Sequence, residues 1–144
     1  MDNVDSYIER FRGGFTGILR WPQLDKLWKT LLQDPNGGWY IYAVGESPPE
    51  TPADARQLEQ FLKEINSLLR REHKEDYCGI VYADNRTNPE FIKIYDPNNL
   101  GVVCGSSAHP PLPGWTLSKT KPMSLTEAFP PVVRGKSWLS RLFQ

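Results

Sequence analysis

The stretch from residue 51 to residue 96 constrains the fold most, because an amphipathic helical pattern is followed there by two short runs typical of strands. The apolar residues of the helical part recur at intervals of three and four, which places them on one face of a helix: Leu58, Phe61, Leu62, Ile65, Leu68 and Leu69. A helix of about 20 residues is ~30 Å long, enough to cross a small sheet. We therefore expect an α+β fold in which one long helix packs against a sheet.

The ends of this helix carry the expected signals. Thr51 can cap the amino end, Pro52 fits the first helical position, and Asp54 interacts favourably with the positive end of the helix dipole. Arg70 and Arg71 lie where the negative end of the dipole favours cations. These signals predict that Thr51 caps a helix whose first residue is Pro52 and which stops near Arg70, Arg71 and Lys74.

The sheet is predicted from residues 39–44, 77–83 and 91–95, which are rich in aromatic and β-branched residues, with residues 115–117 as a fourth candidate strand. Turn-forming residues at 84–89 indicate a hairpin between the second and third runs. If the strands on either side of the long helix are parallel neighbours, the hairpin adds an antiparallel strand. We therefore expect a small mixed sheet of three to four strands.

Two shorter helical patterns precede the sheet, around Tyr7 and Phe11 and around Leu24 and Trp28. These two short helices either cover the sheet or form an arm that binds a partner. Of the 13 prolines, 7 follow Asp96, so the carboxyl-terminal segment is expected to be largely irregular and to wrap around the domain.

A chain of 144 residues suits one domain, which we assign to residues 1–129, followed by a tail at 130–144. The tail holds Trp138, Leu142 and Phe143 beside Lys136 and Arg141. It can form a short amphipathic helix that docks on a partner or a membrane surface, or it can pack on its own domain or fray.

Composition restricts the class of protein. Two cysteines are too few for a disulfide framework, and the acidic amino end lacks a secretory signal. No apolar run approaches the ~18 residues of a membrane span. The 17 basic and 17 acidic residues cancel, which argues against a dedicated nucleic-acid-binding protein. We expect a cytoplasmic, bacterial protein that needs no cofactor.

The segment around Cys104 is the main candidate for chemistry. Gly105, Ser106 and Ser107 form a small-residue turn after the thiol, and His109 is close in sequence. A thiolate nucleophile needs a base and backbone donors that stabilise an oxyanion. A thiol-dependent enzyme with Cys104 as nucleophile and His109 as base is thus one hypothesis, and a buried, inert cysteine is the alternative.

Two other sites involve the same segment. His73 and Cys78 have the same spacing as Cys104 and His109, so the four could bind zinc, although these spacings differ from those of familiar zinc modules. The backbone amides of Gly105, Ser106 and Ser107 could instead bind an anion, although glycine and serine form such turns in most loops for structural reasons alone.

The surplus of aromatic residues favours protein binding, because aromatic rings provide large contact areas at small entropic cost. The candidate binding residues on the strands and the tail are Tyr40, Tyr42, Tyr82, Trp115, Trp138 and Phe143. No nucleotide-binding, zinc-protease or hydrolase motif is present. The sequence therefore favours a noncatalytic protein that binds another protein, such as an adaptor, an accessory or chaperone-like factor, or an inhibitor.

Overall fold

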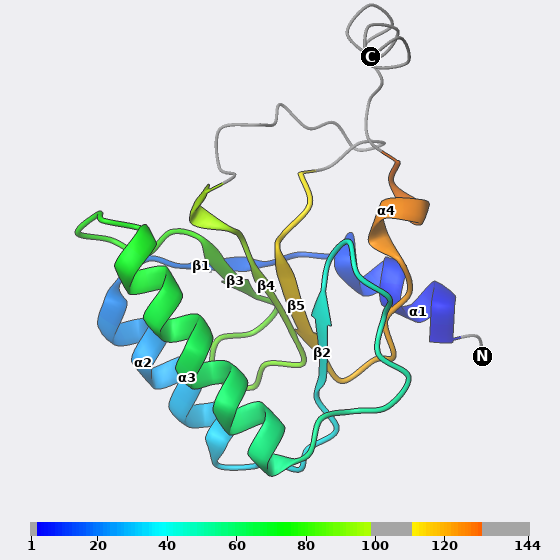
Figure 1. Ribbon diagram of the computed structural model, residues 1–144, viewed down its shortest axis with the longest axis horizontal. Coiled ribbons are helices and arrows are strands. Elements are labelled where there is room, and N and C mark those ends of the chain that lie inside the picture. Colours follow the sequence, from blue (N-terminus) through cyan, green and yellow to red (C-terminus); the bar gives the residue numbers. More distant parts are fainter. Residues whose placement is uncertain (1–2, 99–110, 131–144) are drawn as a thin grey trace, which may run out of the picture.

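A computed structural model describes residues 3–98 and 111–130 (Figure 1). The helices and strands, in chain order, are α1 (Asn3–Phe11), β1 (Thr16–Ile18), α2 (Trp21–Leu32), β2 (Tyr40–Ala43), α3 (Ala55–Glu72), β3 (Val81–Ala83), β4 (Phe91–Ile94), β5 (Trp115–Ser118) and α4 (Leu125–Ala128). None of the helices in these two ranges is long and apolar enough to cross a membrane. Helices and strands are thus combined in one fold, which confirms the α+β class.

The described strands form a five-stranded sheet in the order β1-β3-β4-β5-β2, and every neighbouring pair is antiparallel. The prediction of a mixed sheet with three to four strands is wrong. That prediction assumes that α3 joins parallel neighbours, whereas α3 returns the chain from the β2 edge to β3, with two strands in between. The intervening positions are filled by β4 and β5, which come later in the chain (Figure 1).

The predicted strand at 77–83 is shorter than expected, since only Val81–Ala83 pairs as a strand. Gly79 has a φ of 67°, a left-handed conformation that interrupts an extended run and that glycine adopts at little cost. The amides of Cys78 and Gly79 instead donate to the carbonyls of Leu19 and Ile18 at 2.8 and 2.9 Å. These bonds hold the end of β1, an edge strand whose short Thr-Gly-Ile sequence gave no strand signal.

One face of the sheet is covered by α2 and α3 together, so the long helix does not pack alone (Figure 1). The alternation along the strands turns one set of side chains toward these helices. The buried sheet residues of this α2/α3 face are Ile18, Val81, Ala83, Ile92, Ile94 and Leu117, and the helices contribute Leu24, Leu27, Trp28, Leu31, Leu58, Leu62, Ile65 and Leu69. This is the larger of the two cores.

The opposite face is covered by α1 and α4, so the first predicted helix does cover the sheet. This α1/α4 face holds a second core, consisting of Tyr7, Phe11, Tyr42, Phe91, Leu125 and Phe129. Leu125 and Phe129 come from the proline-rich segment, which in residues 111–130 contains a strand and a helix. Regular structure in this part of the segment is limited to β5 and α4, which make up eight of its twenty residues and are stabilised by burial of their apolar side chains.

The amino end of α3 differs from the prediction. Asp54, rather than Thr51, is the N-cap: its carboxylate accepts from the amide of Gln57 at 2.8 Å, and the Gln57 side chain accepts from the amide of Asp54 at 2.9 Å. This reciprocal capping box satisfies two amides that a helix end leaves without partners. Pro52 therefore precedes the helix, which begins at Ala55.

Candidate functional site

The predicted binding residues lie on opposite faces of the sheet. Tyr42 is opposite Thr116, Thr116 is opposite Lys93, and Lys93 is opposite Tyr82, so this row points to the α1/α4 face. Tyr40, two residues before Tyr42, shares that face. Trp115 points to the α2/α3 face, where it packs against the larger core. These four residues do not form one continuous surface.

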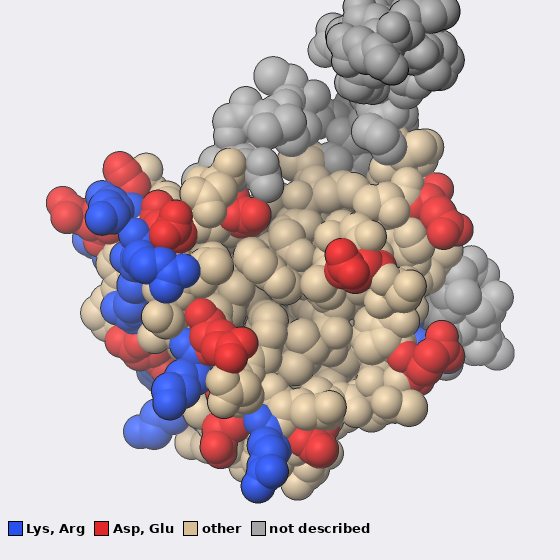
Figure 2. Space-filling model, in the orientation of Figure 1, with Lys and Arg blue, Asp and Glu red and all other residues tan. Residues whose placement is uncertain are grey.

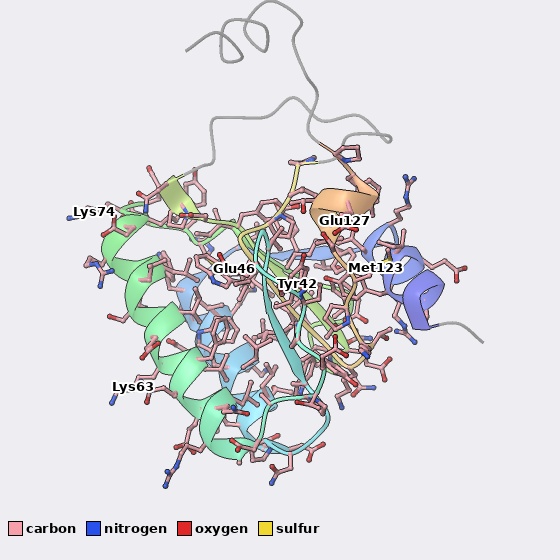
Figure 3. All side chains as sticks on the ribbon, turned by 45° about the vertical axis from the view of Figure 1, so that its right-hand side comes forward. Tyr42, Glu46, Lys63, Lys74, Met123 and Glu127 are labelled. Atoms are coloured by element: carbon pink, nitrogen blue, oxygen red, sulfur yellow. The ribbon has the colours of Figure 1, made fainter. Side chains whose placement is uncertain are left out.

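Tyr42 is fully buried, and Figure 3 labels it in the interior of the domain. Its hydroxyl accepts a hydrogen bond from the amide of Leu125 at 3.1 Å, which ties β2 to the start of α4. A partner therefore has no access to Tyr42 in this conformation. Tyr40, Tyr82 and Trp115 are half-buried and retain accessible surface.

The candidate thiol enzyme and anion site lie outside the described residues, since Cys104, Gly105, Ser106, Ser107 and His109 all fall between residues 99 and 110. The two aromatic residues of the tail, Trp138 and Phe143, fall in the carboxyl-terminal range that is likewise not described. The roles assigned to all of these residues remain predictions.

His73 and Cys78, the other two residues of the zinc hypothesis, are described. His73 ends α3, with its ring centroid 6.1 Å from those of both Trp21 and Tyr77. Its Nε2 is buried and has no hydrogen-bond partner in the described ranges. Cys78 is buried, and burial raises the pKa of its thiol, which opposes formation of a metal-binding thiolate. Residues 3–98 and 111–130 contain no group of three potential metal ligands.

The α2/α3 face leaves an apolar surface next to its core. One side of α3 faces α2, because Asn66 accepts from the Trp28 indole at 3.2 Å and Arg70 pairs with Asp25 at 2.6 Å. At about 100° per residue, Phe61 and Leu68 lie on the other side of α3, toward β5 and β2. Both side chains are only half-buried. Figure 2 shows a recess between α3 and β2 in this region.

We call this surface the α3–β2 recess and define it by five half-buried apolar residues: Ile41, Ala43, Phe61, Leu68 and Trp115. Ala43 and Trp115 also line a cavity of about 340 Å³ at the end of β2, together with the carboxylates of Glu46 and Asp96. Figure 2 shows no Lys or Arg over β2 and β5, whereas basic side chains follow α3. The recess is therefore apolar with acidic groups at one end.

Lys93 is a second unusual feature, on the α1/α4 face. Its Nζ lies 4.0 Å from the ring centroids of both Phe11 and Phe15. The side chain is half-buried, and burial lowers the pKa of its ammonium group to about 8. The two ring faces favour the cation and so hold it at this place in spite of its desolvation.

Sequence reasoning overlooked Lys93, although one signal was present. The residue interrupts the apolar run of Phe91–Ile94, and in a strand it must share a face with Phe91. A lysine beside an aromatic residue on a covered strand indicates a desolvated amine. The sequence does not show that Phe11 and Phe15 of the amino-terminal segment pack against Lys93 on β4.

Comparisons of this chain with protein-family models, with curated proteins and with solved structures found no match.

Proposed function

We propose that this domain is a noncatalytic protein-binding module, such as an adaptor, an accessory factor or an inhibitor, whose partner binds at the α3–β2 recess. The observation that carries the proposal is the set of five half-buried apolar side chains, contributed by α3, β2 and β5, with no basic side chain over the two strands in Figure 2. Contiguous accessible apolar surface of this kind is typical of interaction sites.

The chemistry of the recess defines the partner. Trp115 offers an aromatic anchor of the type that contributes most to protein interfaces, and Phe61 and Leu68 provide an apolar wall. Glu46 and Asp96 line the adjoining cavity and favour a positively charged neighbour. The expected ligand is therefore a peptide segment with one or two large apolar side chains followed by Lys or Arg.

The test compares two leucines on helices. Leu68→Asp places a charge in the recess, whereas Leu32→Asp places the same charge at an exposed leucine on α2. We expect the partner captured by the wild-type chain to bind Leu68→Asp at least ~10-fold more weakly, which corresponds to ~1.4 kcal/mol, and to bind Leu32→Asp as before. Binding is measured by titration calorimetry, with circular dichroism to confirm that both variants fold.

Two further variants distinguish a loss of partner binding at the recess from other causes, such as a folding defect in Leu68→Asp. Ala43→Asp changes the recess from the sheet side, and a chain ending at Gly135 removes the tail with Trp138 and Phe143. Unchanged affinity in folded Leu68→Asp and Ala43→Asp chains would contradict the recess as the binding surface. Loss of binding only in the shortened chain would assign the partner to the tail instead.

A further inference from the structure

The carboxyl-terminal segment, residues 131–144, has the composition of the ligand expected at the α3–β2 recess. It contains three basic residues, Arg134, Lys136 and Arg141, and no Asp or Glu. Two large apolar residues, Trp138 and Leu139, come shortly before Arg141. Large apolar side chains followed by an Arg suit an apolar surface with acidic groups at one end. The chain therefore carries a candidate ligand for its own recess.

The acidic end of the recess includes a carboxylate without a basic neighbour. Glu46 lines the cavity of about 340 Å³ beside Trp115, and residues 3–98 and 111–130 provide its side chain with neither an ion pair nor a hydrogen bond. Glu50, four residues later, differs in this respect, because it pairs with Lys121 at 3.0 Å. A basic residue of the carboxyl-terminal segment has the charge that Glu46 lacks.

The segment starts close to the edge strand that borders the recess. Tyr42 on β2 accepts from the amide of Leu125 at 3.1 Å, and the next residue, Ala43, belongs to the recess. α4 is a single turn of four residues, and Pro130 is the last described residue. From there, eight residues lead to Trp138 and span up to ~26 Å. Because packed layers lie ~10 Å apart, this length is enough to pass from α4 around β2 to α3.

We infer that residues 136–143 bind in the α3–β2 recess of the same chain and compete there with the partner. The inference rests on the recess being the binding surface, as proposed above. Trp138 and Leu142 contact the apolar wall at Leu68, and Arg141 neutralises Glu46. A short flexible linker gives a tethered segment an effective concentration on the order of 1 mM. A segment with a Kd of about 100 μM as a free peptide then fills about nine-tenths of the recesses and weakens partner binding about tenfold.

The test uses full-length chains and a fluorescein-labelled peptide of residues 130–144, whose binding is followed by fluorescence anisotropy. The tail variant combines Trp138→Ser and Leu142→Ser. The matched control combines Val132→Ser and Val133→Ser, which remove two apolar side chains of the same segment outside residues 136–143. We expect the tail variant to bind the peptide about tenfold more tightly than the wild-type chain and the control, because its recess is no longer occupied.

Further substitutions in the tail variant locate the peptide. Leu68→Asp or Ala43→Asp should weaken peptide binding at least ~10-fold, whereas Leu32→Asp, at the exposed position on α2, should leave it unchanged. Circular dichroism checks that each variant folds. A peptide with Arg141→Glu should bind several-fold more weakly, and this difference should shrink at high salt, which screens the attraction to Glu46.

Three results would overturn the inference: equal peptide affinity of the wild-type chain and the tail variant, peptide binding that Leu68→Asp and Ala43→Asp leave unchanged, or wild-type dimers that the tail variant no longer forms. Analytical ultracentrifugation detects such dimers, which would place the segment in the recess of a second copy. Partner binding that depends on Leu68, without peptide binding, would overturn this inference and leave the proposed function standing. Peptide binding at the recess, without partner binding, would do the reverse.

Discussion

At the scale of single residues, buried polar groups show how specifically the α1/α4 face is built. Thr116 is completely buried on β5, and its hydroxyl is 2.8 Å from that of Tyr7, which is also completely buried on α1. Burial raises the pKa of Tyr7, so its hydroxyl remains protonated and able to form this bond. The pair joins residues 109 positions apart in sequence and fixes how α1 lies on the sheet.

Removing one partner of this pair has a predictable cost. Tyr7→Phe leaves the Thr116 hydroxyl buried without a partner and should lower the free energy of unfolding by about 1–2 kcal/mol, as should Thr116→Val. Urea denaturation of both variants and of the double variant measures the effect. The double variant should lose less than the sum of the two, since neither polar group then remains; strictly additive losses would show that the hydroxyls do not interact.

At the scale of elements, local signals fixed the helices more accurately than the strands. The heptad-like spacing of Leu58, Leu62, Ile65 and Leu69 identified the buried side of α3, and all four are buried. The strands are three or four residues long, too short for periodicity to define their ends. Pairing partners, which are distant in sequence, decide where such strands begin and end.

The cap of α3 provides a prediction at this scale. Asp54→Ala removes the acceptor for the Gln57 amide and should destabilise the protein by about 1 kcal/mol. Thr51→Ala should change stability by only a few tenths of a kcal/mol, because Thr51 is exposed and precedes the helix. Thermal denaturation of both variants compares them directly. Equal destabilisation by the two substitutions would support the cap expected from the sequence instead.

At the scale of the whole molecule, two cores lie on opposite sides of one antiparallel sheet. The α3–β2 recess lies on the α2/α3 face, and Lys93 lies on the α1/α4 face. Folding removes the Lys93 ammonium group from water. The stability of the whole domain offsets the cost of this desolvation.

This desolvation predicts how global stability depends on pH. The pKa of Lys93 falls from 10.5 to about 8 on folding, so between these values the unfolded chain binds more protons than the native one, and stability rises with pH. Allowing for the partial exposure of the side chain, the gain from pH 7.5 to pH 9.5 should be on the order of 1 kcal/mol. The window ends near pH 10, where tyrosines of the unfolded chain begin to ionise and stability falls again.

Lys93→Met should remove this gain, and Lys63→Met, at the exposed position on α3, should retain it. Urea denaturation at pH 7.5 and pH 9.5 measures how the free energy of unfolding of each variant changes with pH. A Lys93→Met chain with the wild-type slope would show that this amine titrates alike in the folded and unfolded states.

The sequence by itself determined the α+β class, the buried side of the long helix and the presence of strands at 40–43 and 91–94, because these depend on apolar periodicity and local residue preferences. It also gave candidate residues, of which Tyr40, Tyr82 and Trp115 retain accessible surface. Only the tertiary structure decided that the sheet is antiparallel, that Tyr42 is buried, and that Phe11 and Phe15 meet Lys93. Strand order and side-chain surroundings arise from contacts between distant segments, which no local pattern specifies.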